Sequence, residues 1–413
     1  MPALPRPLRS TTPPERRTRG DLVAAAAIAV VVAVVAALIW WTSDARATIS
    51  TPAAAPVPSL KPAAKVPDAL HELWSTPSAK TTQPLVVAGA VVTGDGREVV
   101  GHDPASGTRL WSYARDLDLC GVTWVYQYAV AVYPDNRGCG QVSTIDAQTG
   151  RRGPTRTAYA DAEVTLSSDG TTVLSAGDSR LELWRSDMVR MLSWGALDAR
   201  IKPDVPQDPL CRLVSAAASS SQVSVLEGCP NQADMRLTML TPSDEEDTPK
   251  TKFQQQPGVS VDSDARVIAV SDTTTALYIP TPKPTVNVVD DTGTVTASTL
   301  LNQKVSPNAA VSHPSDLITW WTGDSVLVFD ANQLRYKYTV APAGANAPVG
   351  PATLMAGELL VPVTSGYDVF NPETGAGVRH IDLKRPPSQD PVIPAVAGST
   401  LLEQRGGTVV ALG

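Results

Sequence analysis

Short apolar runs alternate with polar turn segments along most of this chain. The runs are rich in Val, Thr, Leu and Ile and lie between clusters of Gly, Asp, Asn and Pro, and few longer stretches place apolar residues at helical spacing. Short β-branched runs bounded by turn-forming residues are typical of β-strands. Beyond residue 67 the pattern therefore predicts an all-β structure with almost no helix.

One segment near the N-terminus departs from this pattern. Residues 22–41, LVAAAAIAVVVAVVAALIWW, carry no charge, and about 20 apolar residues are enough for a helix to cross a bilayer. Five Arg and two acidic residues precede the run, and two Trp end it. Basic residues mark the cytoplasmic side and Trp favours the interface, so we expect a single-pass helix with a cytoplasmic N-terminus. The alternative is a cleaved signal peptide, because residues 45–47 form an A-x-A-like site, although such apolar regions usually span about 7 to 15 residues.

The helix divides the chain into a short tail and a long segment on the other side of the membrane. We expect residues 1–21 to be a disordered basic tail. Residues 42–67 contain five prolines and many alanines, a composition that predicts an extended stalk. Residues 68–413 are then a single extracytoplasmic domain.

A repeat with a period near forty runs through this domain. The clearest copy, GAVVTGDGREVVGHDPASGTRLWSY, contains a D-x-x-S-G turn from Asp103 to Gly107, and Trp111 follows four residues later. Two other copies have the same kind of turn, made by Asp146, Thr149 and Gly150 and by Asn371, Thr374 and Gly375. Weaker copies centre on Asp290 and Asp330, so the anchor positions step by 43, 144, 40 and 41 residues. The long step leaves room for two further units with insertions.

Each unit has the pattern of a four-stranded propeller blade, which cannot bury both of its faces alone and must stack in a ring. We expect blades at residues 84–117, 120–157, 161–194, 210–256, 258–301, 306–342 and 349–384, followed by three strands at 392–413. The segment LHELWST, residues 70–76, carries Trp74 at the position that Trp111 has in the first blade. It is expected to supply the missing strand and close an eight-bladed ring. Seven blades is the alternative, because the third and fourth are weakly marked.

Around Trp111 the chain resembles PQQ-like propeller repeats, whose pattern is A-x-D-x-x-T-G-x-x-x-W. Gly101 replaces the Ala and Ser106 the Thr, and the Trp is missing after Gly150 and Gly375. The layout also resembles a group of Ala/Val-rich, single-pass propeller proteins of actinobacteria. In enzymes of the PQQ-like superfamily the quinone is held by adjacent bonded cysteines, a stacked Trp and a calcium site. None of these can be assigned here, so we expect no cofactor, no metal and no catalytic residues. The resemblance then implies a binding role.

The cysteines form two pairs, Cys120 with Cys139 and Cys211 with Cys229, separated by 19 and 18 residues. None lies in a C-x-x-C motif, and only His102 comes within 18 residues of a cysteine, so a metal site is disfavoured. Two local disulfides are expected instead, which agrees with an oxidising, extracytoplasmic compartment.

Few other residues suggest chemistry. The turns at Asp95, Asp169 and Asp290 are interpreted as hairpins rather than calcium loops, because none continues as a D-x-D-x-D-G series. Trp320 and Trp321 are neighbours on a predicted strand and must point to opposite faces. Either one of them is exposed as part of an interaction surface, or packing between blades buries both. No hydrolase, zinc-protease or phosphate-loop motif is present.

Charge limits the partners. The whole chain has a net charge of −7, and since the first 21 residues contribute +3, the remainder carries −10. An acidic domain disfavours nucleic acid. We expect a non-enzymatic scaffold in the cell envelope that binds envelope or secreted proteins; the alternative is a small-ligand sensor or quinoprotein-type enzyme that uses the central channel.

Overall fold

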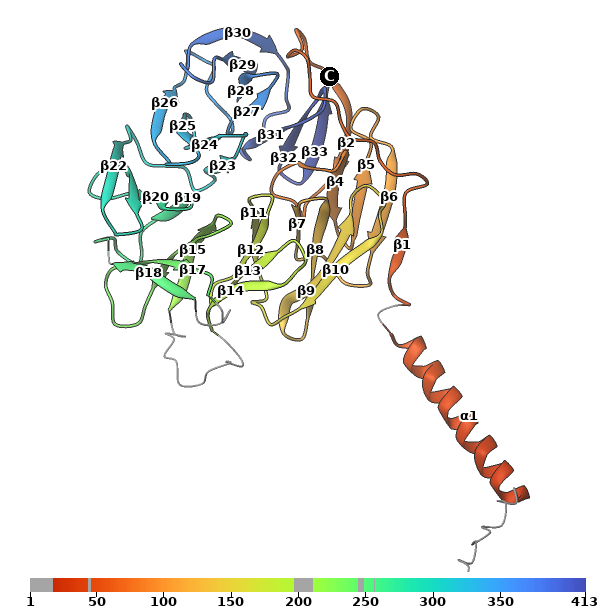
Figure 1. Ribbon diagram of the computed structural model, residues 1–413. Helices are drawn as coiled ribbons and strands as arrows, with labels where there is room; N and C mark the ends of the chain where they lie inside the picture. Colours follow the sequence, from red (N-terminus) through yellow and green to blue (C-terminus); the bar gives the residue numbers. More distant parts are fainter. Residues whose placement is uncertain (1–17, 44–45, 197–210, 244–248, 256) are drawn as a thin grey trace, which may run out of the picture. The chain divides into compact units, whose positions relative to one another are not determined.

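The computed structural model describes residues 18–43, 46–196, 211–243, 249–255 and 257–413. These residues belong to two compact units, and the boundary between them lies after Thr48. The first contains one helix, and the second contains all of the strands (Figure 1).

The helix, α1 (Arg19–Trp41), begins three residues earlier than the apolar run predicts. Thr18 and Asp21 form a capping box, in which the Thr18 amide donates to the Asp21 carboxylate at 2.7 Å and the Asp21 amide donates to the Thr18 hydroxyl at 3.2 Å. These two bonds satisfy amides at the helix end that have no partner within the helix. Residues 19–21 are therefore helical, and residues 1–17 of the predicted tail lie outside the described residues. By length and composition α1 is able to cross a membrane.

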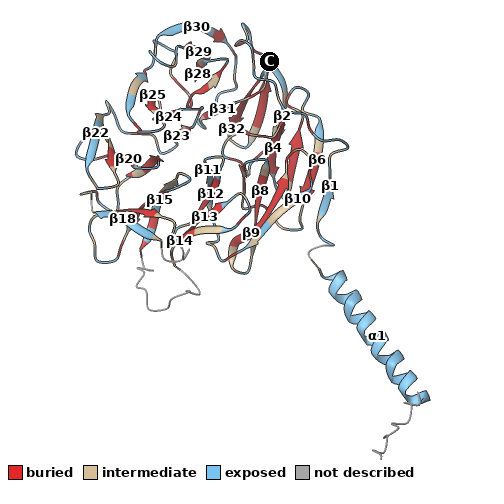
Figure 2. Ribbon diagram, in the orientation of Figure 1, coloured by how far each residue is buried: buried red, intermediate tan, exposed pale blue. Residues whose placement is uncertain are grey.

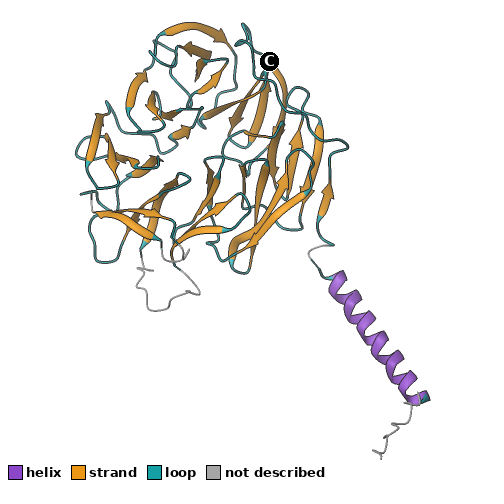
Figure 3. Cartoon of the chain, viewed as in Figure 1, coloured by secondary structure: helices purple, strands orange, loops and turns teal. Residues whose placement is uncertain are grey.

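The second unit is a ring of eight antiparallel sheets, as expected, and the seven-bladed alternative is wrong (Figure 3). Blade 1 contains β3 (Leu85–Val87), β4 (Ala90–Asp95), β5 (Glu98–His102) and β6 (Arg109–Ala114). Blade 2 contains β7 (Gly121–Val125), β8 (Tyr128–Asp135), β9 (Gly138–Asp146) and β10 (Arg152–Thr157). Blade 3 contains β11 (Thr165–Ser168), β12 (Thr172–Ala176), β13 (Arg180–Arg185) and β14 (Arg190–Gly195). Blade 4 contains β15 (Arg212–Ala218), β16 (Val223–Gly228), β17 (Arg236–Thr241) and β18 (Lys250–Gln255).

The second half of the ring repeats the arrangement. Blade 5 contains β19 (Arg266–Val270), β20 (Thr274–Ile279), β21 (Thr285–Asp290) and β22 (Val295–Leu300). Blade 6 contains β23 (Ala310–Ser312), β24 (Leu317–Trp321), β25 (Val326–Asp330) and β26 (Tyr336–Val340). Blade 7 contains β27 (Thr353–Met355), β28 (Glu358–Val363), β29 (Gly366–Phe370) and β30 (Gly377–Asp382). Blade 8 contains β31 (Val392–Ala397), β32 (Thr400–Arg405), β33 (Thr408–Leu412) and β2 (Glu72–Pro77).

Blade 8 joins the two ends of the domain, as the position of Trp74 predicts. β2, which we call the closing strand, pairs antiparallel with β33, with Trp74 opposite Ala411 and Pro77 opposite Thr408. Just beyond it, the Thr81 hydroxyl donates to the side chain of Gln404 at 3.0 Å. The first strand of the ring is thereby held by its last strands.

The expected stalk is wrong for most of its length. β1 (Ile49–Thr51) pairs with β6 as a fifth strand of blade 1. Residues 49–70, which we call the strap, then follow the ring, and the Ala53 and Val57 amides donate to carbonyls of the turn at residues 148–149. Val57 and Val66 are buried in the cores beside blades 1 and 7. Leu70 joins the same core as Val66. A Pro-rich segment loses little entropy when it docks, so these three buried residues help to hold it against the ring.

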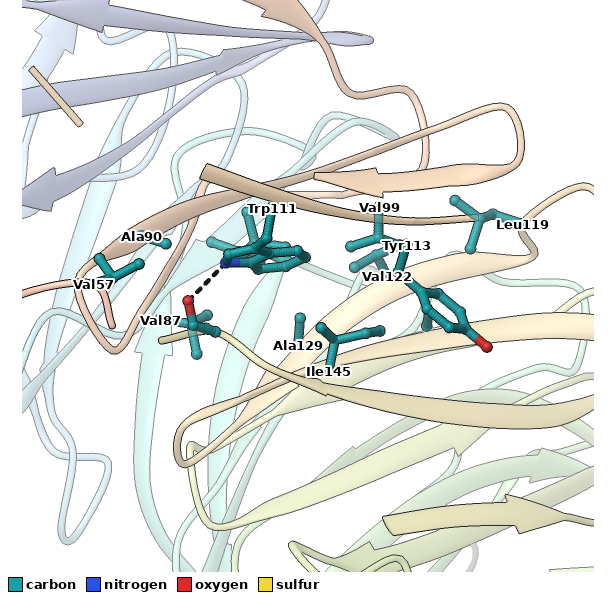
Figure 4. Close-up of a cluster of buried hydrophobic side chains, with 14 of the residues drawn as sticks. Val57, Val87, Ala90, Val99, Trp111, Tyr113, Leu119, Val122, Ala129 and Ile145 are labelled. Atoms are coloured by element: carbon teal, nitrogen blue, oxygen red, sulfur yellow. Dashed lines mark hydrogen bonds between the residues drawn. The ribbon is translucent and has the colours of Figure 1, made fainter. Parts of the chain in front are cut away.

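The hydrophobic core is divided among the interfaces between blades. The second and third strands of each blade are almost fully buried, whereas most of the outermost strands are exposed on one face (Figure 2). Between blades 1 and 2, Trp111, Tyr113, Leu119 and Ile145 pack together with Val57 of the strap (Figure 4). Because each blade is covered on both faces, the sequences of its central strands are nearly continuous apolar runs and do not alternate between apolar and polar residues.

Candidate interaction surfaces

The predicted repeat residues form tight turns between the third and fourth strands of their blades. The Asp103 carboxylate accepts the amides of Ala105 and Ser106 at 3.1 and 2.9 Å, and Asp146 accepts the amides of Gln148 and Thr149 at 3.1 and 2.9 Å. Asn371 does the same for Glu373 and Thr374. Gly107, Gly150 and Gly375 have φ near +70°, where L side chains are strained. The repeat residues are therefore explained by the backbone conformation that each turn requires.

These turns also join neighbouring blades. An aromatic side chain on the outer strand of one blade lies on the turn glycine of the next and donates to a carbonyl of that turn: Trp74 to Pro104 at 2.9 Å, Trp111 to Ala147 at 2.7 Å and Tyr338 to Pro372 at 2.8 Å. The Trp of the repeat therefore packs on, and hydrogen-bonds to, the turn of the following blade. This explains why Gly375 keeps its role although no Trp follows it: Tyr338 of blade 6 contacts it.

Gly107→Ala is expected to destabilise the ring more than Gly96→Ala. Both glycines have positive φ, which costs about 1–2 kcal/mol for an L residue. At residue 107 an added Cβ would also lie 2.7 Å from Trp74, whereas nothing lies within 4 Å at residue 96. Overpacking of this kind adds about 1–3 kcal/mol. Equal midpoints for the two variants in urea unfolding would show that the contact between the turn and Trp74 contributes nothing.

Both predicted disulfides are present, Cys120–Cys139 and Cys211–Cys229. Each ties the beginning of the innermost strand to the hairpin between the second and third strands of its own blade, in blades 2 and 4. They close short loops within single blades. Their part in the ring is therefore structural.

The interpretation of Trp320 or Trp321 as a surface residue is wrong. The two side chains are 1% and 7% exposed. They do point to opposite faces of β24, but Trp320 packs in the core between blades 5 and 6 and Trp321 in the core between blades 6 and 7. The indole N–H of Trp321 donates to the Pro348 carbonyl at 2.8 Å. Both faces of a blade are interior, so alternation along a strand does not bring either residue to the surface.

A buried carboxylate that sequence reasoning missed joins blades 7 and 8. Glu403 is fully buried and accepts bonds from Arg385 at 2.7 Å, from the Tyr367 hydroxyl at 2.6 Å and from Arg405 at 2.6 Å. Burial alone would raise the pKa of Glu403, but Arg385, Arg405 and the Tyr367 hydroxyl hold it below its ordinary value. Burial and the Glu403 charge raise the pKa of Tyr367 well above its ordinary value. The group is a fully bonded ion cluster within the ring.

Two similar carboxylates join neighbouring blades elsewhere. Glu182 of blade 3 accepts from Arg156 of blade 2 at 3.1 Å and from Trp184 at 2.8 Å. Glu227 of blade 4 accepts from Trp194 of blade 3 at 3.2 Å and from Thr238 at 2.7 Å. The sequence signal for all three is a lone Glu next to Leu inside a strand. Glu227 lies close to Cys211 and Cys229, whose sulfurs are bonded to each other and offer no thiolate ligand.

A cavity of about 400 Å³ lies among the innermost strands of the ring. Its lining combines aliphatic residues such as Ala217 and Val267 with the hydroxyl residues Thr165, Ser167 and Thr172. Asp169 and His313 also line it, and the Asp169 carboxylate accepts the Thr171 and Thr172 amides. This size is within the range of small-ligand sites, about 300–1,000 Å³.

Comparisons with known proteins agree with this architecture. No protein-family model and no curated protein matches the chain. Among solved structures, BamB from Moraxella catarrhalis aligns at 13% identity over 83% of this chain and 99% of its own, with a TM-score of 0.50. The computationally designed Ika8 protein aligns at 15% identity over 82% and 98%, with a TM-score of 0.54. The C-terminal WD40 domain of Sif2 aligns at 11% identity over 84% and 99%, with a TM-score of 0.53.

At these identities the likeness establishes the fold alone. The chain is a β-propeller repeat protein that also carries an N-terminal apolar helix.

Proposed function

We propose that this chain is a single-pass protein of the plasma membrane, with a cytoplasmic N-terminus and an extracytoplasmic ring. Three observations support this topology. The apolar side chains of α1 have no protein covering in the described residues, Arg residues precede the helix, and two disulfides are formed, which persist in oxidising compartments.

We further propose that the ring is a non-enzymatic scaffold of the PQQ-like type that binds envelope or secreted proteins. The observation that carries this proposal is that the repeat residues are engaged in holding the blades together: turn carboxylates bond their own amides, and aromatic side chains bond the next blade. A closed ring built this way fixes many loops in place. Rigid loops bind partners with little loss of entropy on association.

Crosslinking on intact cells tests the scaffold and the topology together. A membrane-impermeant, amine-reactive crosslinker followed by mass spectrometry is expected to link ring lysines such as Lys252 and Lys337 to a reproducible partner. Unmodified ring lysines on intact cells would contradict the topology. Labelled lysines with no reproducible partner would contradict the scaffold.

The matched control is a chain in which Glu72–Pro77 is replaced by alternating Gly and Ser. It keeps α1 but lacks the closing strand, so partner links are expected to disappear while membrane association remains. Partner links that survive in this variant would assign the binding to α1 or to the residues before it.

The cavity among the innermost strands favours a second candidate, a small-ligand sensor or quinoprotein-type enzyme that uses the central channel. Its walls combine aliphatic residues with hydroxyls and with His313. Titration of the purified protein with PQQ and calcium, followed by absorbance in the quinone band, separates the two functions. The scaffold proposal expects no bound quinone.

A further inference from the structure

The outer edges of the blades are not equally protected. An outermost strand exposes a row of backbone groups, and proteins usually block such edges with charges, Pro or a covering segment. In blade 1 the outer strand β6 is covered by β1, which is only three residues long and is followed by Pro52. Of the outermost strands that the structure describes in the other seven blades, six carry charged residues, in some cases with Pro: Glu72 and Pro77 in β2, Arg152, Pro154 and Arg156 in β10, Arg190 in β14, Lys250 and Lys252 in β18, Lys337 in β26, and Arg379, His380 and Asp382 in β30. β22, with the sequence VTASTL, has neither charge nor Pro. Its Val295 and Leu300 are 51% and 61% exposed.

The backbone of β22 is available along this edge. Among the described strands, β22 pairs only with β21. The Leu301 amide donates to the Pro284 carbonyl at 2.8 Å, and bonding alternates along an antiparallel ladder. The amides and carbonyls of Ser298 and Leu300 therefore point away from β21.

Blade 1 shows what such an edge accepts. Both β6 and β22 have a bulge near their start. When residues are counted from the bulge, Ser112 of β6 is equivalent to Ser298 of β22, and Ala114 is equivalent to Leu300. β1 pairs with this part of β6, with Thr51 opposite Ser112 and Ile49 opposite Ala114. The sequence of β1 is Ile-Ser-Thr, and all three residues are exposed. Backbone bonds, rather than buried side chains, therefore hold an uncharged strand at this position.

We propose that the edge of β22 is the docking site for an extended, uncharged segment of a partner protein, which adds to blade 5 as a fifth antiparallel strand. The inference rests on the proposed scaffold function and assigns its recognition site. The segment matches β1 in chemistry, with β-branched and hydroxyl residues and no charge, because β22 offers backbone groups and small apolar side chains but no ionic partner. Lysine or arginine on the partner strand would be placed beside Val295 or Leu300.

Hydrogen exchange of the full-length protein in detergent micelles tests this site. The probe is a capped peptide of residues 47–53, ATISTPA, at millimolar concentration, because so few backbone bonds give weak binding. Exchange over residues 295–301 is expected to slow several-fold, while residues 336–340 of the Lys337-guarded β26 do not change. A peptide of the same sequence with N-methylated alternate amides is expected to have no effect. Absence of slowing with the unmodified peptide would overturn the proposal.

Two proline variants provide a matched comparison. Ser298→Pro removes an outward amide without removing a bond to β21, and Thr339→Pro makes the equivalent change in β26. Ser298→Pro is expected to abolish the peptide effect and Thr339→Pro to leave it intact, with native circular dichroism for both. If Ser298→Pro does not fold, Ser298→Lys places a charge on the edge and is expected to weaken the effect in the same way. Peptide protection that persists in both Ser298 variants would overturn the site.

The remaining outcomes separate this site from the scaffold function. Slow exchange over residues 295–301 that depends on protein concentration without peptide would mean that β22 pairs with a second copy, against the proposal. A cellular partner that still crosslinks to Ser298→Pro would leave the scaffold standing and remove β22 as its site. A peptide effect without any cellular partner would retain the edge and contradict the scaffold.

Discussion

A chain whose closing strand, Glu72–Pro77, is replaced by alternating Gly and Ser is expected to lose most of the stability of its ring. Trp74 leaves its site on Gly107, and because Trp74 is only half-buried its loss costs less than the about 3–5 kcal/mol of a fully buried Trp. The ladder between β2 and β33 is lost as well, at about 0.5–1.5 kcal/mol for each bond. The sum is comparable with the whole stability of a typical domain, about 5–15 kcal/mol. Thermal unfolding followed by far-ultraviolet circular dichroism measures the loss.

The control for this prediction is the same replacement in β18, Lys250–Gln255. That strand has the same length and also lies at the outer edge of a blade, but its removal leaves the ring closed. Its melting temperature is expected to fall much less. Equal losses in the two variants would mean that ring closure adds nothing to the stability of an individual blade.

Glu403→Ala is expected to lower the free energy of unfolding by about 3–5 kcal/mol, because it leaves the Arg385 charge buried without its carboxylate. The Arg385 side chain is only 6% exposed. Lys65→Ala is the control, since Lys65 and Asp68 are 77% and 78% exposed and solvent largely screens so exposed a pair. Urea unfolding at neutral pH measures both. A loss below that of Lys65→Ala would contradict the ion-cluster assignment.

The same carboxylate gives the ring a dependence on pH. The pKa of Glu403 is lower in the folded protein than its ordinary value. Its contribution to stability is therefore complete above the unfolded pKa, about 4.3 for Glu, and is lost as the pH falls through the folded value. Native stability is expected to fall on acidification below that point. Glu403→Gln is expected to show a shallower fall, and an unchanged slope would exclude Glu403 as its source.

The ring was predictable because its repeat unit depends on local chemistry. The turns at Asp103, Asp146 and Asn371 require an Asx side chain and a glycine, and these appear in the sequence at near-constant spacing. The closing strand was predictable because Trp74 copies Trp111. Blades 3 and 4 lack these markers, yet they form because apolar runs at the right spacing still stack.

The remaining features depend on contacts that spacing does not contain. The strap has the composition of a free stalk, and the burial of Val57, Val66 and Leu70 becomes visible only in the structure. Of the two alternatives for Trp320 and Trp321, burial between blades is confirmed and exposure is wrong, because a rule for sheets with one solvated face does not apply to a blade covered on both faces. The carboxylate clusters bring together residues from different blades, such as Tyr367 and Glu403. The unguarded edge of β22 becomes visible only when the outer strands of all blades are known.

Because β2 belongs to blade 8, the ring can close only after the last strand has been synthesised. β2 is synthesised near the beginning of the domain, yet its partner β33 comes more than 300 residues later, as the bond between Thr81 and Gln404 shows with its separation of 323. At about 5–20 residues per second, the early strand waits about 20 to 60 s for its partner to leave the ribosome. During that interval Glu72 and Pro77 discourage wrong pairing. A polypeptide truncated before its final blade would leave β2 unpaired and the ring open, which makes it a substrate for the proteases that remove incomplete proteins.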